Sequence, residues 1–302
     1  MKYSAEHILT NNIVRRQTRS LHRHFAEQCR SRYGMLREVG GATWIQVHPA
    51  LPVRAWLSEP DVSADSRVVD ALIADVRKVR PTAEIRWLLY RPPEQSAVRT
   101  RLEEAGFELR VDCPGMTCAP GDTPGQALNG AARVGDGAGA RPESARGAGG
   151  AAITVAEVGD SREARVWTSI YTQSNGHPTE AADAFAQALP EAWQARTDSV
   201  WFLGYAGGRP VTCAKLRIEP DGDARVAGLY QLATLPDVRG RGYGAALMRE
   251  LMARAREIYG VDTFVLQAEP KARSLYERLG FRVDSIMAVY ILSGLDSRGS
   301  AS

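Results

Sequence analysis

The sequence has no long apolar run and no segment that resembles a secretory leader. No window of 18 or more residues is both apolar and uncharged, which excludes a membrane-spanning helix of ordinary length. Charged residues, among them Arg15, Arg19 and Glu27, interrupt the N-terminal region, so the apolar stretch of a signal peptide is missing as well. We therefore expect a cytoplasmic protein without membrane contact.

The sequence is also poor in cysteine and in net charge. Its 4 cysteines, Cys29, Cys113, Cys118 and Cys213, lack the paired spacing of a zinc site and have no accompanying pair of histidines. We predict reduced structural thiols and no metal. The formal net charge of +3 is too small to indicate nucleic-acid binding, and we interpret the basic stretch 15–32 as a solvated helix face.

The composition is that of a globular protein with two domains, since 44% of the 302 residues are hydrophobic and 24% are charged. A Gly- and Ala-rich segment at 120–150 contains almost no large apolar residue, so it cannot bury enough surface to offset its ordering entropy. We interpret it as a flexible linker between a domain at 1–119 and a domain at 151–302.

The second half has the periodicity of strands that alternate with helices. Strands are predicted at 153–158, 199–206, 209–218, 224–233, 263–267 and 283–292, and helices at 162–173, 244–259 and 271–279. Gly207 and Gly208 mark a hairpin turn, and Gly280 is placed to end the last helix. This order predicts a mixed α/β domain.

A short internal repeat links the two halves. Residues 101–108 (RLEEAGFE) and 276–282 (YERLGFR) both show a helix that ends at a Gly-Phe pair and leads into a strand. The repeat predicts a duplicated fold, and chance similarity around a Gly-Phe pair is the alternative. When the two pairs are superposed, Leu102 takes the position of Tyr276.

Three closely spaced glycines, Gly240, Gly242 and Gly244, lie between a predicted strand and a predicted helix. A loop without side chains can turn its backbone N–H groups toward one point, and the helix that follows adds the positive end of its dipole. Such a loop fits a pyrophosphate, and an ordinary tight turn is the alternative. The Lys-Ser/Thr of a P-loop and the downstream acid of a dinucleotide fold are missing, which argues against nucleoside triphosphates and NAD.

This loop resembles the first hallmark of the GCN5-related N-acetyltransferase (GNAT) superfamily, Arg/Gln-x-x-Gly-x-Gly/Ala after a strand, which Arg239, Gly242 and Gly244 match. The stretch 272–281 (ARSLYERLGF) is similar to the second hallmark and follows in the expected order. The resemblance implies a mixed α/β fold with two GNAT-like domains joined by the Gly/Ala-rich linker. The first would be a degenerate copy, because 1–119 contains no Arg-x-x-Gly-x-Gly.

In that superfamily the end of the strand binds the pantetheine arm of acetyl-CoA, or of another acyl-CoA, and the loop binds its pyrophosphate. The resemblance implies these roles for Leu232, Ala233 and Thr234 at the strand end, and for Arg239, Gly240, Arg241, Gly242, Tyr243, Gly244 and Ala245 in the loop. A backbone N–H near a bulge in the strand ending at Ala233 would polarise the thioester carbonyl.

Tyr276 lies where the superfamily commonly has its tyrosine acid, so the resemblance implies that it protonates the departing thiolate. The general base is open, because the strand sequence 227–231 (AGLYQ) has no carboxylate where many relatives have a glutamate. Glu219, Glu269, His177 and a water relay are the alternatives.

The resemblance implies an enzyme that transfers an acetyl or other short acyl group from acyl-CoA to the amine of a small molecule. A non-catalytic CoA-binding or regulatory module is one alternative, and a thioester reaction by decarboxylation or carrier-protein transfer is another. We expect acceptor contacts from the turn at 173–178 and from the first half, and a simple helix end at Asn175 and Gly176 is the alternative for the turn. We assign the larger aromatic residues to the cores: Trp44, Trp56, Trp87, Trp167, Tyr171 and Trp193. We expect no nucleic acid or membrane partner, and a homodimer is left open.

Overall fold

The computed structural model describes residues 5–58, 66–90, 97–120, 143–146, 152–221 and 224–294. The first half contains α1 (Ala5–Gln28), β1 (Met35–Val39), β2 (Ala42–Gln46), β3 (Val53–Leu57), α2 (Arg67–Val79), β4 (Ile85–Tyr90), α3 (Ala97–Glu104) and β5 (Glu108–Cys118). The second half contains β6 (Glu143–Arg146), β7 (Ala152–Glu157), α4 (Ser161–Asn175), α5 (Thr179–Gln194), β8 (Ser199–Ala206), β9 (Arg209–Asp221), β10 (Ala224–Thr234), α6 (Tyr243–Tyr259), β11 (Thr263–Gln267), α7 (Arg273–Glu277) and β12 (Arg282–Leu292). Turns of 3-10 helix at Pro236–Val238 and Pro270–Ala272 precede α6 and α7.

The strands of these ranges form one mixed sheet of 12 strands, in the order β1-β2-β3-β4-β12-β5-β11-β10-β9-β8-β7-β6. Most neighbours are antiparallel, while β3 with β4 and β10 with β11 are parallel pairs. The predicted mixed α/β fold is therefore confirmed. None of the helices in the described ranges has the length and apolar character needed to cross a membrane.

The elements predicted for the second half are present, because their signals are local. Gly207 and Gly208 have φ angles of 57° and 80°, as a two-residue hairpin turn between β8 and β9 requires. Gly280, with φ 92°, follows the last helix. The predicted helix 271–279 is α-helical only over Arg273–Glu277. No sequence signal predicted α5, which has Pro190 inside it.

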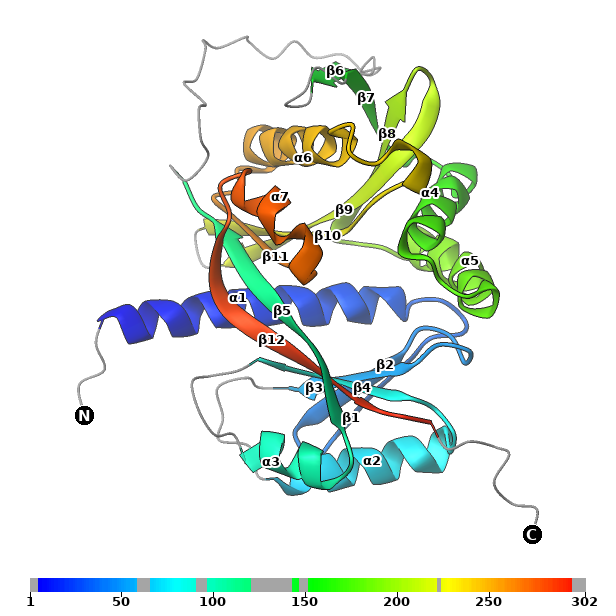
Figure 1. Ribbon diagram of the computed structural model, residues 1–302, viewed down its shortest axis with the longest axis vertical. Coiled ribbons are helices and arrows are strands. Elements are labelled where there is room, and N and C mark those ends of the chain that lie inside the picture. Colours follow the sequence, from blue (N-terminus) through cyan, green and yellow to red (C-terminus); the bar gives the residue numbers. More distant parts are fainter. Residues whose placement is uncertain are drawn as a thin grey trace.

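The last strand of each half lies beside strands of the other half. β12 pairs with both β4 and β5, and β5 pairs with both β12 and β11. Figure 1 shows β5 and β12 running together across the middle of the molecule. Their pairing is interrupted beside Arg110 and beside Asp284, which lie at the same distance along the chain after Gly106 and Gly280. The short sequence repeat thus corresponds to equivalent strands, while common ancestry of the halves stays a prediction.

The predicted linker at 120–150 lies mostly outside the described residues. Its described part, Glu143–Arg146, is the edge strand β6 and pairs with β7, so this part differs from a flexible linker. The domain boundaries at 1–119 and 151–302 stay a prediction. The exchange of β5 and β12 means that neither range builds its part of the sheet alone.

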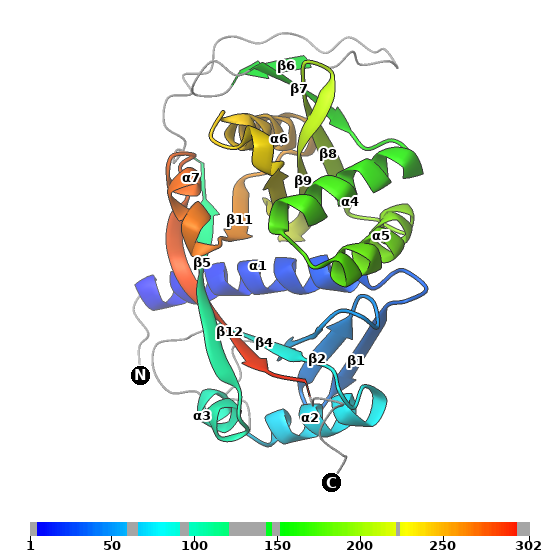
Figure 2. The ribbon, with the colours of Figure 1, turned by 45° about the vertical axis from the view of Figure 1, so that its right-hand side comes forward.

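Helix α1 lies between the two halves, as the two views in Figures 1 and 2 show. Arg15, Arg19 and Arg23 are exposed, as predicted for a basic helix face. The other polar residues of the same helix are buried: Gln17, Thr18, Ser20, His24, Glu27 and Gln28. The prediction of a solvated face therefore holds for the arginines alone, because the second half covers the rest.

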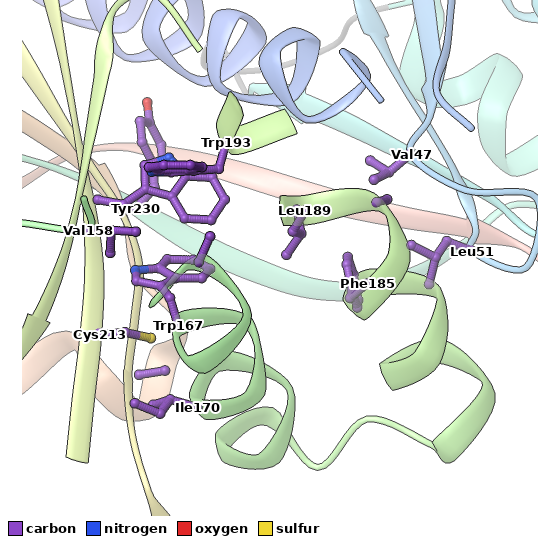
Figure 3. Close-up of a cluster of buried hydrophobic side chains, with 14 of the residues drawn as sticks. Val47, Leu51, Val158, Trp167, Ile170, Phe185, Leu189, Trp193, Cys213 and Tyr230 are labelled. Carbon is purple, nitrogen blue, oxygen red and sulfur yellow. The ribbon is translucent and has the colours of Figure 1, made fainter. Parts of the chain in front are cut away.

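A hydrophobic cluster also joins the halves. It brings Val47 and Leu51 of the first half together with Phe185 and Leu189 of α5 (Figure 3). The predicted assignment of the tryptophans to the cores is confirmed by exposures of at most 7%: Trp44, Trp56, Trp87, Trp167 and Trp193. Tyr171 is less buried than these and contacts the same cluster from its edge.

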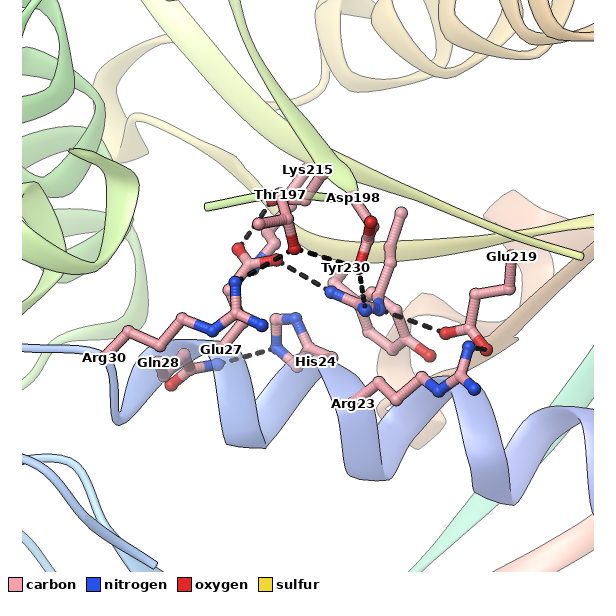
Figure 4. Close-up of polar contacts among 12 residues, drawn as sticks. Arg23, His24, Glu27, Gln28, Arg30, Thr197, Asp198, Lys215, Glu219 and Tyr230 are labelled. Carbon is pink, nitrogen blue, oxygen red and sulfur yellow. Dashed lines mark hydrogen bonds and ion pairs between the residues drawn. The ribbon is translucent and has the colours of Figure 1, made fainter. Parts of the chain in front are cut away.

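Glu27 of α1 lies at the centre of a buried ion cluster (Figure 4). Its side chain is 1% exposed, and its oxygens lie 2.6 Å from Lys215 Nζ and 2.7 Å from a terminal nitrogen of Arg217. Arg217 also contacts Glu219 and Asp198. Burial lowers the pKa of Lys215 to about 8, and the nearby Glu27 carboxylate opposes this shift. Lys215 therefore depends on Glu27 for charge compensation, and Arg217 shares this carboxylate in addition to those of Glu219 and Asp198.

We expect the substitution Glu27→Gln to lower the free energy of unfolding by about 3–5 kcal/mol, because it leaves Lys215 and Arg217 buried without their shared carboxylate. Urea denaturation followed by tryptophan fluorescence measures this loss. The matched control is Glu191→Gln, which removes the exposed ion pair with Arg32 between the same two halves and should have a much smaller effect. Equal losses in the two variants would contradict the structural role of Glu27.

Candidate functional site

The loop between β10 and α6 has an open, glycine-based conformation. Gly240 and Gly242 have φ angles of 77° and 82°, and a Cβ added at either would meet no atom within 4 Å. Gly242 is the N-cap of α6, where no side chain caps the helix. The first backbone N–H groups of α6 are thus left for a ligand, and the helix dipole favours an anion there.

A cleft of about 600 Å³ opens beside this loop. Its walls are the end of β10, the loop with the first turn of α6, and the segment around α7. The cleft contains nearly all the residues predicted to bind the cofactor: Leu232, Ala233, Thr234, Arg239, Gly240, Gly242, Tyr243, Gly244 and Ala245. Arg241 is exposed and does not line it.

The cleft is strongly cationic. Arg239, Arg249, Lys271 and Arg278 line it, and no Asp or Glu is among its lining residues. One terminal nitrogen of Arg249 is buried without a hydrogen-bond partner. Such a cleft favours a ligand with several negative charges. Arg249, Lys271 and Arg278 were not predicted, because each lies outside the glycine motif.

The Arg239 side chain makes hydrogen bonds to two backbone carbonyls. Its Nε donates to the Thr234 carbonyl at 3.2 Å, and a terminal nitrogen donates to the Ser174 carbonyl at the end of α4. The guanidinium therefore ties the loop to β10 and α4. Arg239 also lines the cleft, and its contact with a pyrophosphate stays a prediction.

β10 contains the bulge predicted before Ala233. Its register with β9 shifts between Tyr230 and Ala233, and Gln231 has φ 56°, which is rare for a residue other than glycine. β10 pairs with the parallel strand β11 only as far as Gly228. The two strands separate beyond that point, so the bulge lies where the cleft begins.

Tyr276 lines the cleft opposite the end of β10. Its ring packs edge-on against Phe281, with ring centroids 5.9 Å apart. Burial, with a smaller contribution from the Glu269 carboxylate, raises the pKa of Tyr276 to about 12. The phenol therefore keeps its proton at neutral pH and can donate it as a hydrogen bond into the cleft.

Residues 165–281, which include the loop, the bulge and Tyr276, match the family model of the acetyltransferase (GNAT) family. The second half of the chain contains a GNAT acetyltransferase domain. Members of this family use acetyl-CoA as the acyl donor. No curated protein matches the chain significantly.

Solved structures of GNAT proteins resemble the chain over most of its length. A GCN5-related N-acetyltransferase from Kribbella flavida is 21% identical, with a TM-score of 0.58 over 91% of this chain and 94% of that protein. One from Sphaerobacter thermophilus is 16% identical, with a TM-score of 0.51 over 83% of this chain and 76% of that protein. A tandem GNAT protein from the clavulanic acid biosynthesis pathway is 12% identical, with a TM-score of 0.55 over 87% of this chain and 84% of that protein. At these identities the likeness shows the fold alone.

The three base candidates of the GNAT domain occupy different places. Glu219 is 4% exposed and bonded to Arg217 and Arg23, in the ion cluster beneath α1. Glu269 is half-exposed, and its carboxylate acts on the pKa of both Tyr276 and Tyr171. His177 contacts the Tyr171 ring, with centroids 5.7 Å apart. Glu269 is thus near Tyr276, and His177 is near Tyr171, whereas Glu219 belongs to the ion cluster.

The parallel strands of the first half separate in the same way, but their opening is filled. β3 and β4 pair from Val53 to Ala55, and beyond this point a cavity of only about 20 Å³ remains. The ring of His22 from α1 stacks on Trp56 in the opening, with centroids 4.7 Å apart. Leu102, the counterpart of Tyr276, is 0% exposed in the core. The opening between β3 and β4 therefore has no room for a cofactor.

Proposed function

We propose that the protein is an N-acyltransferase, which moves an acetyl or another short acyl group from acyl-CoA to the amine of a small molecule. The observation that carries this proposal is the cationic cleft beside Gly242, which Tyr276 and the end of β10 after its bulge also line. Coenzyme A carries a pyrophosphate and a further phosphate, so the unpartnered nitrogen of Arg249 and the free N–H groups of α6 fit its charge.

Bound acyl-CoA supplies the activated thioester carbonyl that an amine attacks. In the proposed mechanism, the bulge presents a backbone N–H to the carbonyl oxygen, which becomes negative as the amine adds. The Tyr276 hydroxyl donates its hydrogen to the departing sulfur. Because its pKa is raised to about 12, Tyr276 is present as the acid over the whole neutral range.

The amine must lose a proton, and we propose Glu269 or His177 for this step. Glu269 follows β11 and pairs with Lys271 of the cleft wall at 2.7 Å, close enough to Tyr276 for its charge to affect the phenol. Burial lowers the pKa of His177, so its imidazole is neutral at pH 7 and able to accept a proton. The position of Glu219 in the ion cluster speaks against its use as the base.

We expect the purified protein to bind one acetyl-CoA per chain in isothermal titration calorimetry, because the opening in the first half is filled by His22 and Trp56. With a panel of small amines, it should release thiol from acetyl-CoA only when an acceptor is present. A thiol-reactive chromophore measures that release. Tight binding without acceptor-dependent release would identify a CoA-binding module, and release without an acylated amine would indicate another thioester reaction.

A further inference from the structure

We propose that the acceptor amine carries a carboxylate, which Arg54 of the first half binds across the interface between the halves. This inference rests on the proposed function, because it names the class of substrate for the same site. In this proposal the first half, whose opening between β3 and β4 is filled, contributes a substrate-binding residue to the site of the second half.

Arg54 is an arginine inside the protein without an acidic partner. It lies on β3, next to Arg86 in register, and is only partly accessible to solvent. Its guanidinium packs over the Phe25 ring of α1, 5.0 Å from the ring centroid. No described residue forms a hydrogen bond or an ion pair with its side chain, whereas the other arginine of the interface core, Arg217, has three carboxylates. A guanidinium held away from bulk water in this way favours an anionic ligand.

Two polar groups near Arg54 have a side-chain atom that is buried without a hydrogen-bond partner and could bind a ligand. The positive charge of Arg54 affects the pKa of Tyr171, near the end of α4, and that of His177, in the turn that follows. The Nε2 atom of His177 is buried without a hydrogen-bond partner, and so is the side-chain oxygen of Gln231 in the bulge. Arg54, Tyr171, His177 and Gln231 form what we call the Arg54 cluster. None of the four members is acidic, and the Glu269 carboxylate, which affects the pKa of Tyr171, is paired with Lys271 at 2.7 Å.

The Arg54 cluster includes a residue of the bulge in β10, Gln231. Tyr171 lies beside the side-chain amide of Gln231. Gln231 is the residue with positive φ in the bulge, two positions before Ala233, which lines the cleft. In the proposed binding mode, a molecule with its amine at the bulge extends past Tyr171 toward Arg54. The turn at 173–178, predicted to contact the acceptor, supplies His177 to this path.

The charge of the cluster favours a carboxylate over a phosphate. Arg86, the neighbouring cation, is already paired with Glu84 at 2.6 Å. Burial together with the charges of Arg54 and Arg86 lowers the pKa of His177, so the imidazole is neutral. The remaining positive charge is that of Arg54, and a single carboxylate on the ligand neutralises it. The planar fork of Arg54 also matches a carboxylate.

The test compares acceptors that differ only in the anion. Common amino acids are assayed with acetyl-CoA beside their carboxamides, and phosphoethanolamine beside ethanolamine. We expect the wild-type protein to prefer the carboxylate of a pair. Arg54→Gln should raise the KM for the carboxylate acceptor by about 10- to 100-fold and leave the carboxamide unchanged, with acetyl-CoA affinity intact. Arg54→Lys should retain part of the preference.

Arg86→Gln is the matched control, because it removes a neighbouring arginine that already has a partner. It should change the KM far less than Arg54→Gln. The proposal is overturned if the carboxylate and carboxamide are used equally, if the phosphate is preferred, or if Arg54→Gln keeps the preference. If no amine is acylated, binding of the same amino acids in the presence of CoA is measured by ligand-observed NMR. Binding that depends on Arg54 would then sustain the carboxylate subsite and reject the transferase, and no such binding would reject the subsite as well.

Discussion

Replacing Gly242 by valine is expected to weaken acetyl-CoA binding by about 100-fold while the protein stays folded. Gly242 has φ 82° and caps α6, and a β-branched residue is strained in this region of backbone space. Relief of that strain would move the first N–H groups of α6 away from the cleft, and the new side chain would occupy the loop. Isothermal titration calorimetry with acetyl-CoA measures the loss.

The matched control is Gly208→Val. Gly208 also has positive φ, at 80°, and also has no atom near an added Cβ. It lies in the hairpin turn between β8 and β9, and it does not line the cleft. Both variants should lose a similar amount of thermal stability, and only Gly242→Val should lose cofactor affinity. An unchanged affinity in Gly242→Val would show that the loop is not the pyrophosphate site.

The cofactor loop could be predicted from sequence because each of its signals is local. Glycines at 240 and 242 indicate a backbone with positive φ, which both residues have. The strand before them and the helix after them have clear hydrophobic periodicity. The bulge in β10 was placed correctly by the resemblance alone, since no side chain marks it. The second hallmark singled out Tyr276, which lines the cleft, while its role as the acid stays a prediction.

The relation between the halves could not be predicted, because it depends on contacts between distant segments. The exchange of β5 and β12 follows from strand pairing across most of the chain, which periodicity does not encode. The same holds for α1, where Glu27 and His24 look like surface residues until the second half covers them. No sequence motif marks Arg54. Its proposed role in binding a carboxylate depends on the absence of an acidic partner among its described neighbours on other elements, which the sequence does not reveal.

Tyr276→Phe is expected to lower kcat by about 10²- to 10⁴-fold and to leave the affinity for acetyl-CoA unchanged, because it removes a proton donor and keeps the ring. The phenylalanine retains the edge contact with Phe281, so the wall of the cleft is preserved. Stopped-flow measurement of thiol release, at saturating acetyl-CoA and acceptor, separates kcat from binding. Tyr205→Phe, at the hairpin end of β8, is the matched control and should keep its rate.

The pH dependence gives a second readout of the same role. With a Tyr276 pKa of about 12, the phenol stays protonated from pH 6 to pH 10. Ionisation of Tyr276 should therefore cause no fall of the wild-type kcat in this range, and any alkaline fall should also be present in Tyr276→Phe. If Tyr276→Phe keeps the wild-type kcat, the proton comes from another donor and the tyrosine only shapes the cleft. If kcat falls and the acetyl-CoA affinity falls with it, the hydroxyl acts in binding. A loss of kcat alone is the result that assigns Tyr276 as the acid.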